Sequence, residues 1–145
     1  MTTIDSISVD IIENALRNAK DEMDATLFRS AMSPVIREQH DCFPMITDAQ
    51  GRMVVGNFGS HVPEVVNHFK EGIFEGDVIF VSDPYSCGGS ISHINDWMII
   101  LPIFYDGSII GYSSMFGHVM DVGGPVSSSM PVQARTIYGE GVRFP

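Results

Sequence analysis

The sequence predicts an α/β domain in which a long N-terminal amphipathic helix precedes a mixed β-sheet, with a central hairpin and with site residues on loops at the strand ends. Helical periodicity over residues 8–32 is the first observation, because apolar residues recur there at steps of three and four. Two apolar segments, residues 97–105 and 108–116, flank Asp106-Gly107, the dipeptide that best suits a tight hairpin turn. The length of 145 residues fits a single domain, 1–145.

The periodic N-terminal segment is bounded by residues with clear preferences for helix ends. Ser8 suits the N-cap position, and Asp10 then lies in the first turn, where the helix dipole favours an acidic side chain. Ser33-Pro34 predicts the end of the helix, because proline disfavours helical geometry in the residue before it. Residues 35–41 are dense in charge and show no clear period, so they predict a connector that holds several potential ligands.

The middle of the chain predicts a small hairpin, a short helix and a buried strand. Residues 42–47 and 52–55 suit strands and are separated by a turn-like segment. Pro63 suits the first position of a short helix that ends at Gly72. Residues 77–82 contain an unbroken apolar run, which is typical of a strand covered on both faces.

Composition excludes several classes of function. The formal net charge of −10 would repel a phosphate backbone, which argues against a nucleic-acid partner. The longest apolar run, residues 97–105, has about half of the roughly 20 residues that a membrane-spanning helix needs. Cys42 and Cys87 make no disulfide framework, and residues 1–10 lack the pattern of a signal peptide, so we expect a cytoplasmic protein without a membrane partner. The 44% apolar composition indicates that some apolar surface meets another chain or further residues.

Two short HxxD patterns flank the predicted central hairpin: His93 with Asp96, and His118 with Asp121. Imidazole and carboxylate ligands together suit Zn²⁺, Mn²⁺ or Fe²⁺, and the chain has no CxxC pair of the kind that builds a structural zinc ribbon. Two structural alternatives to a metal site remain open. His93 and Asp96 could be a surface loop residue and a cap, and His118 could be a buried histidine bonded to Asp121.

Other candidate groups favour structural roles. His61 and His68 are interpreted as surface or packing residues. Cys87 lies in a glycine-rich loop, but no partnered base accompanies it, so we expect a buried thiol in place of a nucleophile. The loop of residues 86–90 lacks the GxxxxGK[ST] pattern of a phosphate-binding loop, and the chain has no GxSxG elbow.

Taken in chain order, the motifs are residues 10–16, Ser33-Pro34 with Arg37-Glu38 and Asp41, residues 76–78 and 83–85, the two HxxD pairs with Val122-Gly-Gly124, residues 129–131, and Glu140-Gly141. This series resembles the N-terminal part of the hydantoinase B/oxoprolinase family. The family includes subunits of N-methylhydantoinase and 5-oxoprolinase, caprolactamase, and the catalytic subunits of acetone and acetophenone carboxylases.

The resemblance implies a metal-bearing subunit that works beside a hydantoinase A-type partner, which uses ATP to activate a small carbonyl or amide substrate. It implies a divalent metal ion, Zn, Mn or Fe. The implied metal ligands are Asp41, His93, Asp96 and His118. Asp121 and Glu38 become supporting or acid/base candidates, and residues 1–145 become the N-terminal metal-binding portion of a hydantoinase B-type subunit.

Two departures from the family pattern shape the expectations. Gly89 and His93 are separated by three residues, whereas in the family the first histidine follows the glycines closely, so the wall of the site is expected to differ. Family members are several times longer, so we expect a fragment or split subunit whose remainder is a partner. Three hypotheses follow: a ring-opening amidohydrolase component, a subunit of an ATP-dependent ketone carboxylase, or a non-catalytic assembly module with a structural metal.

Overall fold

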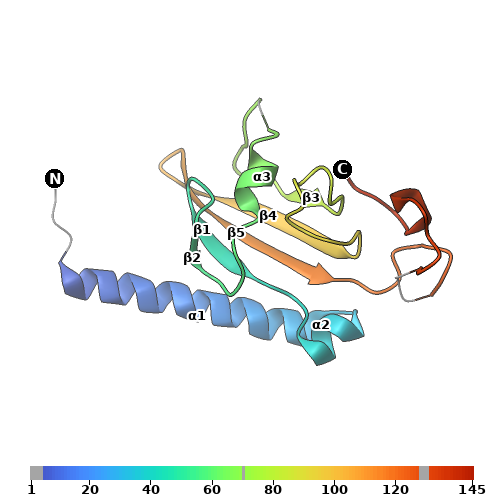
Figure 1. The fold of residues 1–145 in the computed structure, drawn as a ribbon. Coiled ribbons are helices and arrows are strands. Elements are labelled where there is room, and N and C mark those ends of the chain that lie inside the picture. Colours follow the sequence, from blue (N-terminus) through green and yellow to red (C-terminus); the bar gives the residue numbers. More distant parts are fainter. Residues whose placement is uncertain (1–4, 70, 128–130) are drawn as a thin grey trace.

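The computed structural model describes residues 5–69, 71–127 and 131–145. In chain order the elements are α1 (Ser6–Ser30), α2 (Pro34–Gln39), β1 (Met45–Asp48), β2 (Met53–Val55), α3 (Val62–Val66), β3 (Ile79–Val81), β4 (Asp96–Tyr105), β5 (Ser108–His118) and the 3₁₀ turn η1 (Ile137–Gly139). The five strands form one sheet in the order β2-β1-β5-β4-β3. The long helix α1 runs along one side of this sheet and α3 lies on the other (Figure 1). The α/β prediction is confirmed.

The sheet is antiparallel in every described strand pair, so the prediction of a mixed sheet is wrong. The connections explain three of the four pairs, all except β1–β5. Tight turns join β1 to β2 and β4 to β5, and the loop of residues 82–95 joins β3 to the start of its neighbour β4. Adjacent strands joined in this way run in opposite directions, whereas a parallel pair needs a crossover to the far end of the sheet.

The pair β4–β5 forms the middle of the sheet and turns at Asp106-Gly107. Both turn residues have positive φ, 48° and 72°, as a tight two-residue hairpin turn requires. The register shifts by one between Ile103 and Phe104, so that Ile110 of β5 is an extra residue at this point. Beyond this bulge the pairing continues to Asp96 and His118, which lie opposite each other at the far end of the hairpin.

The core lies on the sheet face that carries α3. Side chains of β1, β3, β4 and β5 alternate between the two faces, and those on this face pack against α3 and the loop of residues 82–95. The buried cluster consists of Met45, Val62, Val65, Ile79, Val81, Cys87, Ile91, Met98, Ile100 and Tyr112. Cys87 is therefore a buried thiol, as predicted, and its Sγ donates to the carbonyl of Asp83 at 3.2 Å.

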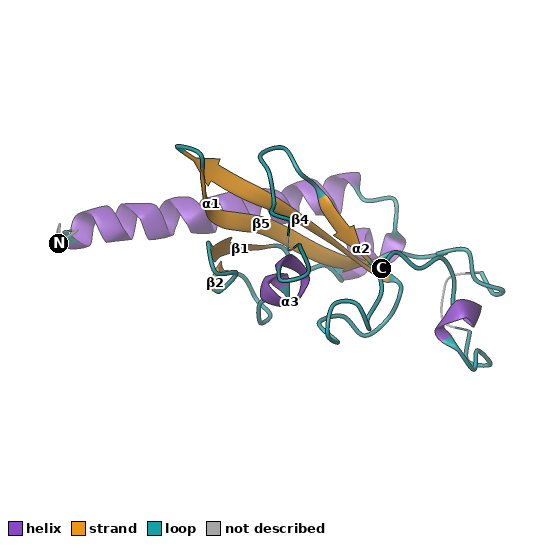
Figure 2. Ribbon diagram, turned by 90° about the horizontal axis from the view of Figure 1, so that it is seen from above, coloured by secondary structure: helices purple, strands orange, loops and turns teal. Residues whose placement is uncertain are grey.

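The opposite face of the sheet is only partly covered by α1, which crosses it at an angle in the view from above (Figure 2). A groove of about 610 Å³ lies between the second half of α1 and the sheet, with Met23, Leu27, Ile99 and Leu101 among its lining residues. Near the start of α1 the apolar side chains are mostly exposed: Ile7 69%, Val9 47%, Ile11 63% and Ile12 53%. This face of the domain is therefore not closed by the residues that the structure describes.

The ends of α1 differ from the prediction. Asp5 is the N-cap, and its carboxylate accepts a hydrogen bond from the backbone N–H of Ser8 at 2.9 Å, so the prediction that Ser8 caps the helix is wrong. An aspartate three residues earlier offers that N–H a carboxylate acceptor, which Ser8 itself cannot do from inside the helix. The helix ends at Ser30, ahead of Ser33-Pro34.

Residues 34–39 form the helix α2, so the predicted connector is also wrong. Pro34 occupies the first turn, where proline is well tolerated, and Ile36 is buried to 5% exposure. His40 ends the helix in a left-handed conformation with φ 58°. The chain thereby turns sharply between α2 and the segment that carries Asp41.

The strand β3 lies at an edge of the sheet, with Ile79 and Val81 buried in the core. Val78 beside it is 62% exposed and Phe80 is half-buried.

Among the described residues, no helix is both long enough and apolar enough to cross a bilayer. Ser129 and Met130, which contribute to the family resemblance, lie outside the described residues.

Candidate metal centre

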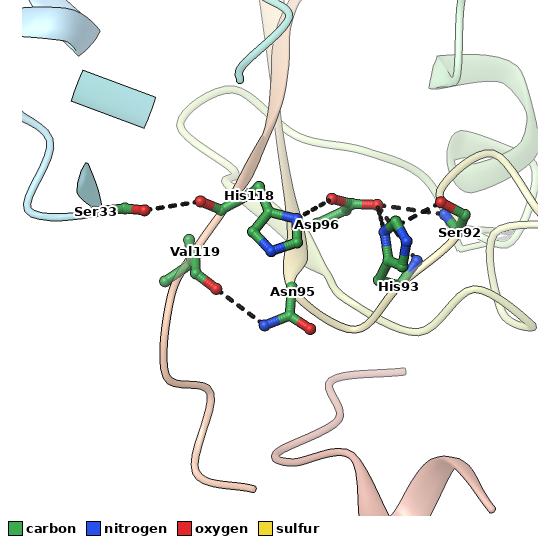
Figure 3. A network of polar contacts seen from close by, with 7 residues as sticks. All are labelled: Ser33, Ser92, His93, Asn95, Asp96, His118 and Val119. Atoms are coloured by element: carbon green, nitrogen blue, oxygen red, sulfur yellow. Dashed lines mark hydrogen bonds and ion pairs between the residues drawn. The ribbon is translucent and has the colours of Figure 1, made fainter. Parts of the chain in front are cut away.

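The side chains of His93, Asp96 and His118 meet at the open end of the β4–β5 hairpin (Figure 3). One ligand atom from each residue lies within 4.8 Å of the ligand atoms of the other two. Asp96 begins β4, His118 ends β5, and His93 lies on the loop that leads into β4. The two ends of the hairpin and one loop therefore supply the cluster.

The strand register explains why Asp96 and His118 meet. The backbone N–H of His118 donates to the carbonyl of Asp41 at 3.0 Å, and its carbonyl accepts from the hydroxyl of Ser33 at 2.8 Å. Both backbone groups of His118 thus point away from β4, as in a non-hydrogen-bonded antiparallel pair, whose side chains lie closest together. The Nδ1 atom of His118 lies 3.4 Å from Oδ1 of Asp96.

The carboxylate of Asp96 connects both imidazoles and also holds the loop in shape. Nδ1 of His93 lies 2.9 Å from Oδ2 of Asp96. The same oxygen accepts hydrogen bonds from the backbone N–H groups of Ser92 and His93, at 3.4 and 3.3 Å. Asp96 therefore fixes the loop that precedes it and bridges two potential metal ligands, whereas the alternative interpretation had it cap the segment that follows.

The cluster is buried on one side and open on the other. The side chains of Asp96 and His118 are 11% and 9% exposed, whereas that of His93 is 42% exposed. The two rings lie 5.7 Å apart between centroids, at an angle of 71°. Solvent therefore reaches the cluster at His93.

The donor set fits a divalent metal ion. Two imidazoles and one carboxylate converge from three backbone positions, and neutral imidazole with carboxylate suits Zn²⁺, Mn²⁺ or Fe²⁺. Three protein ligands leave at least one further position on such an ion, for another side chain, water or a substrate.

The structure does not bring the other predicted site residues into this cluster. Asp41 contributes its backbone carbonyl to His118, but its carboxylate is not among the clustered ligand atoms. Glu38 is exposed on α2 and lies 3.0 Å from the guanidinium of Arg37. Asp121 is exposed beyond β5, at φ 61°, and accepts a hydrogen bond from the backbone N–H of Gly123 at 3.4 Å. His118 faces Asp96, so the alternative pairing of His118 with Asp121 is wrong.

Sequence reasoning missed two polar residues around the cluster. Ser33, 8% exposed, carries the hydroxyl that bonds the carbonyl of His118. Asn95, 1% exposed, donates from Nδ2 to the carbonyl of Val119 at 3.0 Å. Ser33 was interpreted only as part of the predicted end of the N-terminal helix. The one sequence feature that could have indicated Asn95 was its position inside the first HxxD pattern.

His61 is a buried packing residue outside the cluster, consistent with its interpretation from sequence. It is 2% exposed, and its Nε2 lies 2.5 Å from the hydroxyl of Ser114. Its ring meets Phe116 edge-on, with 5.2 Å between centroids. Burial lowers the pKa of His61 to about 4, which keeps the imidazole neutral at neutral pH.

Comparison with known proteins places this site in a family context. The family model for hydantoinase B/oxoprolinase matches residues 5–145. The chain is 35% identical to caprolactamase subunit beta from Pseudomonas jessenii, over 100% of this chain and 26% of the relative. The crystal structure of the ATP-dependent caprolactamase from Pseudomonas jessenii matches with a TM-score of 0.83 and 33% identity, over 99% of this chain and 26% of that chain.

A nucleotide-free structure of acetone carboxylase shares the fold, with a TM-score of 0.71 and 22% identity over 92% of this chain and 19% of that chain. The chain thus spans about a quarter of the length of the caprolactamase subunit, 26%. The family model extends over every described residue, including the whole hairpin and its cluster. The resemblance seen in the motifs is confirmed, and the chain belongs to the hydantoinase B/oxoprolinase family.

Proposed function

We propose that this chain is the metal-binding portion of a subunit in an ATP-coupled heteromeric enzyme that opens a cyclic amide by hydrolysis. The observation that carries the proposal is the convergence of His93, Asp96 and His118 on one point at the open end of the hairpin. Membership of the hydantoinase B/oxoprolinase family supports it. The similarity to a caprolactamase described as ATP-dependent supports the coupling to ATP.

The three clustered residues have distinct tasks in this proposal. A bound divalent ion would polarise the substrate oxygen or activate water. His118 and Asp96 hold the buried side of the site, and the carboxylate partly neutralises the charge of the ion. His93 lies at the exposed side, from which a carbonyl or amide substrate would approach.

The remaining predicted site residues are part of the proposal as well. Asp41 is the proposed fourth ligand, because its backbone already contacts His118. Asp121 and Glu38 are proposed as supporting or acid/base groups, and both are exposed. If Asp121→Asn abolishes metal binding while Asp41→Asn does not, the fourth ligand has been assigned to the wrong carboxylate.

A partner of the hydantoinase A type is proposed to bind ATP and use it to activate the substrate. The remainder of a hydantoinase B-type subunit is the second proposed partner. The matched caprolactamase chain is named subunit beta, which supports a multi-subunit enzyme. The glycine-rich loop of residues 86–90 lacks the lysine and spacing of a phosphate-binding loop, which is consistent with ATP binding elsewhere.

Metal analysis tests the proposal directly. We expect the purified protein to hold about one divalent ion per chain, and His93→Ala with His118→Ala to lose it. His68→Ala is the matched control, because His68 is an exposed histidine outside the cluster. A wild-type protein without stoichiometric metal, together with a double variant that leaves the activity of the complex intact, would favour the assembly module instead.

Substrate-stimulated ATP hydrolysis by the complete complex separates the two enzyme hypotheses. Stimulation by hydantoins, oxoproline or lactams supports the amidohydrolase. Stimulation by acetone or acetophenone with bicarbonate, and not by cyclic amides, would assign the complex to ketone carboxylation.

A further inference from the structure

Asn95 lies between His93 and Asp96 in the sequence, but its amide is directed at the end of β5 (Figure 3). The side chain is 1% exposed, and Nδ2 donates to the carbonyl of Val119 at 3.0 Å. The backbone carbonyl of Asn95 accepts from the N–H of Val119 at 2.8 Å. The two residues therefore exchange two hydrogen bonds, and a side-chain amide supplies the donor that a backbone N–H supplies in a regular ladder.

These two hydrogen bonds lie next to the pair Asp96 and His118, whose backbone groups do not bond to each other. His118 uses both its N–H and its carbonyl toward the α2 side of the sheet. Asp96 donates its N–H to the carbonyl of His93 at 3.2 Å, inside the turn. The bonds between Asn95 and Val119 therefore tie the turn of residues 93–96 to the end of β5.

The position of this tie matters because the three clustered residues come from two separate pieces of chain. His93 lies on the turn that precedes β4, whereas Asp96 begins β4 and pairs with His118 at the end of β5. Any freedom between the turn and β5 would change the position of His93, and of the Asp96 carboxylate that it contacts, relative to His118. The distance from Nδ1 of His118 to Oδ1 of Asp96 is 3.4 Å, already longer than the 2.9 Å contact within the turn.

We propose that Asn95 is a positioning residue that holds the turn of residues 93–96 against β5 and thereby sets the spacing of the metal ligands. This inference rests on the proposed metal centre. Groups that orient metal ligands without touching the ion generally change metal affinity about 10- to 100-fold when they are removed. The competing explanation is a purely structural one, in which the amide only satisfies the carbonyl of Val119 and its loss lowers stability alone.

Cobalt binding distinguishes these explanations, because the visible absorption of Co²⁺ reports the geometry of its ligands. The purified full chain is titrated with Co²⁺, and affinity is measured in parallel by calorimetry. We expect Asn95→Ala to bind Co²⁺ about tenfold more weakly or worse, with an altered absorption spectrum. Ser82→Ala is the matched control, since Ser82 is fully buried and its hydroxyl accepts the backbone N–H of Phe144 at 3.1 Å.

Asn95→Asp is a second variant that keeps the shape of the side chain, in case the alanine protein does not fold. At pH 7.5 the carboxylate cannot donate to the carbonyl of Val119, but it adds a negative charge near the site. A role through charge predicts tighter binding of the cation, whereas a positioning role predicts weaker binding.

Three outcomes would overturn the role of Asn95. The first is a folded Asn95→Ala or Asn95→Asp protein with wild-type affinity and spectrum. The second is an equal loss of affinity in Ser82→Ala at equal stability, which assigns the effect to general destabilisation. The third is a wild-type protein that binds no metal, which overturns the metal centre itself together with this inference.

Discussion

His61 is expected to make the folded protein sensitive to acid in a way that one substitution removes. The hydroxyl of Ser114 donates to the carbonyl of Ile99 at 3.1 Å. Its oxygen is therefore the acceptor of a hydrogen bond from the N–H at Nε2 of His61. The other ring nitrogen, Nδ1, is buried without a hydrogen-bond partner among the described residues. Protonation would place a charge and a second donor in this apolar site, which is why burial lowers the pKa of His61 to about 4.

The size of the effect follows from the difference between the two states. An unfolded chain binds the proton near the ordinary pKa of 6.5, whereas the folded protein binds it only near 4. Between these values the unfolded state holds more protons, so stability is present in full above about pH 6.5 and is lost as the pH falls toward 4. The difference corresponds to about 3 kcal/mol in total, of which about 2 kcal/mol is lost between pH 7.5 and pH 5.

Equilibrium unfolding in urea at pH 7.5 and pH 5 measures this loss. His61→Gln keeps a polar group near Ser114 but cannot take up a proton, so the wild-type protein should lose about 2 kcal/mol more than the variant. Comparing the two proteins at both pH values cancels the contributions of all other titrating groups. His68→Gln removes an exposed imidazole and should retain the wild-type loss. Equal losses in the wild type and His61→Gln would refute the buried neutral imidazole.

Further predictions concern the sheet on which the cluster depends. A Cβ atom on Gly111 would collide with the backbone carbonyl oxygen of Thr47, so Gly111→Ala should cost about 1–3 kcal/mol in urea unfolding, whereas Gly59→Ala, with open space around it, should be near neutral. Met98 is fully buried, and Met98→Ala should cost about 2–5 kcal/mol with an unchanged denaturant slope. Gly107→Ala should cost about 1 kcal/mol by thermal unfolding, because its φ of 72° disfavours a Cβ atom.

The sequence was most informative where a signal acts over a few residues. Asp106-Gly107 needs positive backbone angles, and the chain does turn there. The helix at residues 34–39 could not be predicted in the same way, because the segment has no apolar period and Ile36 is its one buried residue. The direction of β3 relative to β4 depended on the path of the intervening loop, which carries no periodic signal.

The candidate site shows the same limit. The HxxD spacing brings His93 and Asp96 together within one turn, and that part was predictable from the local pattern. The choice of Asp96 as the residue facing His118, in place of Asp121, depends on strand pairing across the hairpin. The position of the Asp41 carboxylate depends on the left-handed turn at His40, a conformation that few non-glycine residues adopt.

The bulge at Ile110 determines which residue faces Asp96. Between the turn and the bulge, the residue numbers of each β4–β5 pair sum to 213, as for 104 with 109. Beyond the bulge they sum to 214, as for 103 with 111. An unbulged ladder would therefore place Gly117 opposite Asp96 and turn His118 to the other face of the sheet. Loop tips usually tolerate changes in length, but a single inserted or deleted residue between the turn and the bulge would separate the ligands at the other end of the hairpin. Length variation near the hairpin turn is thus constrained by a cluster of side chains that lies a full strand away.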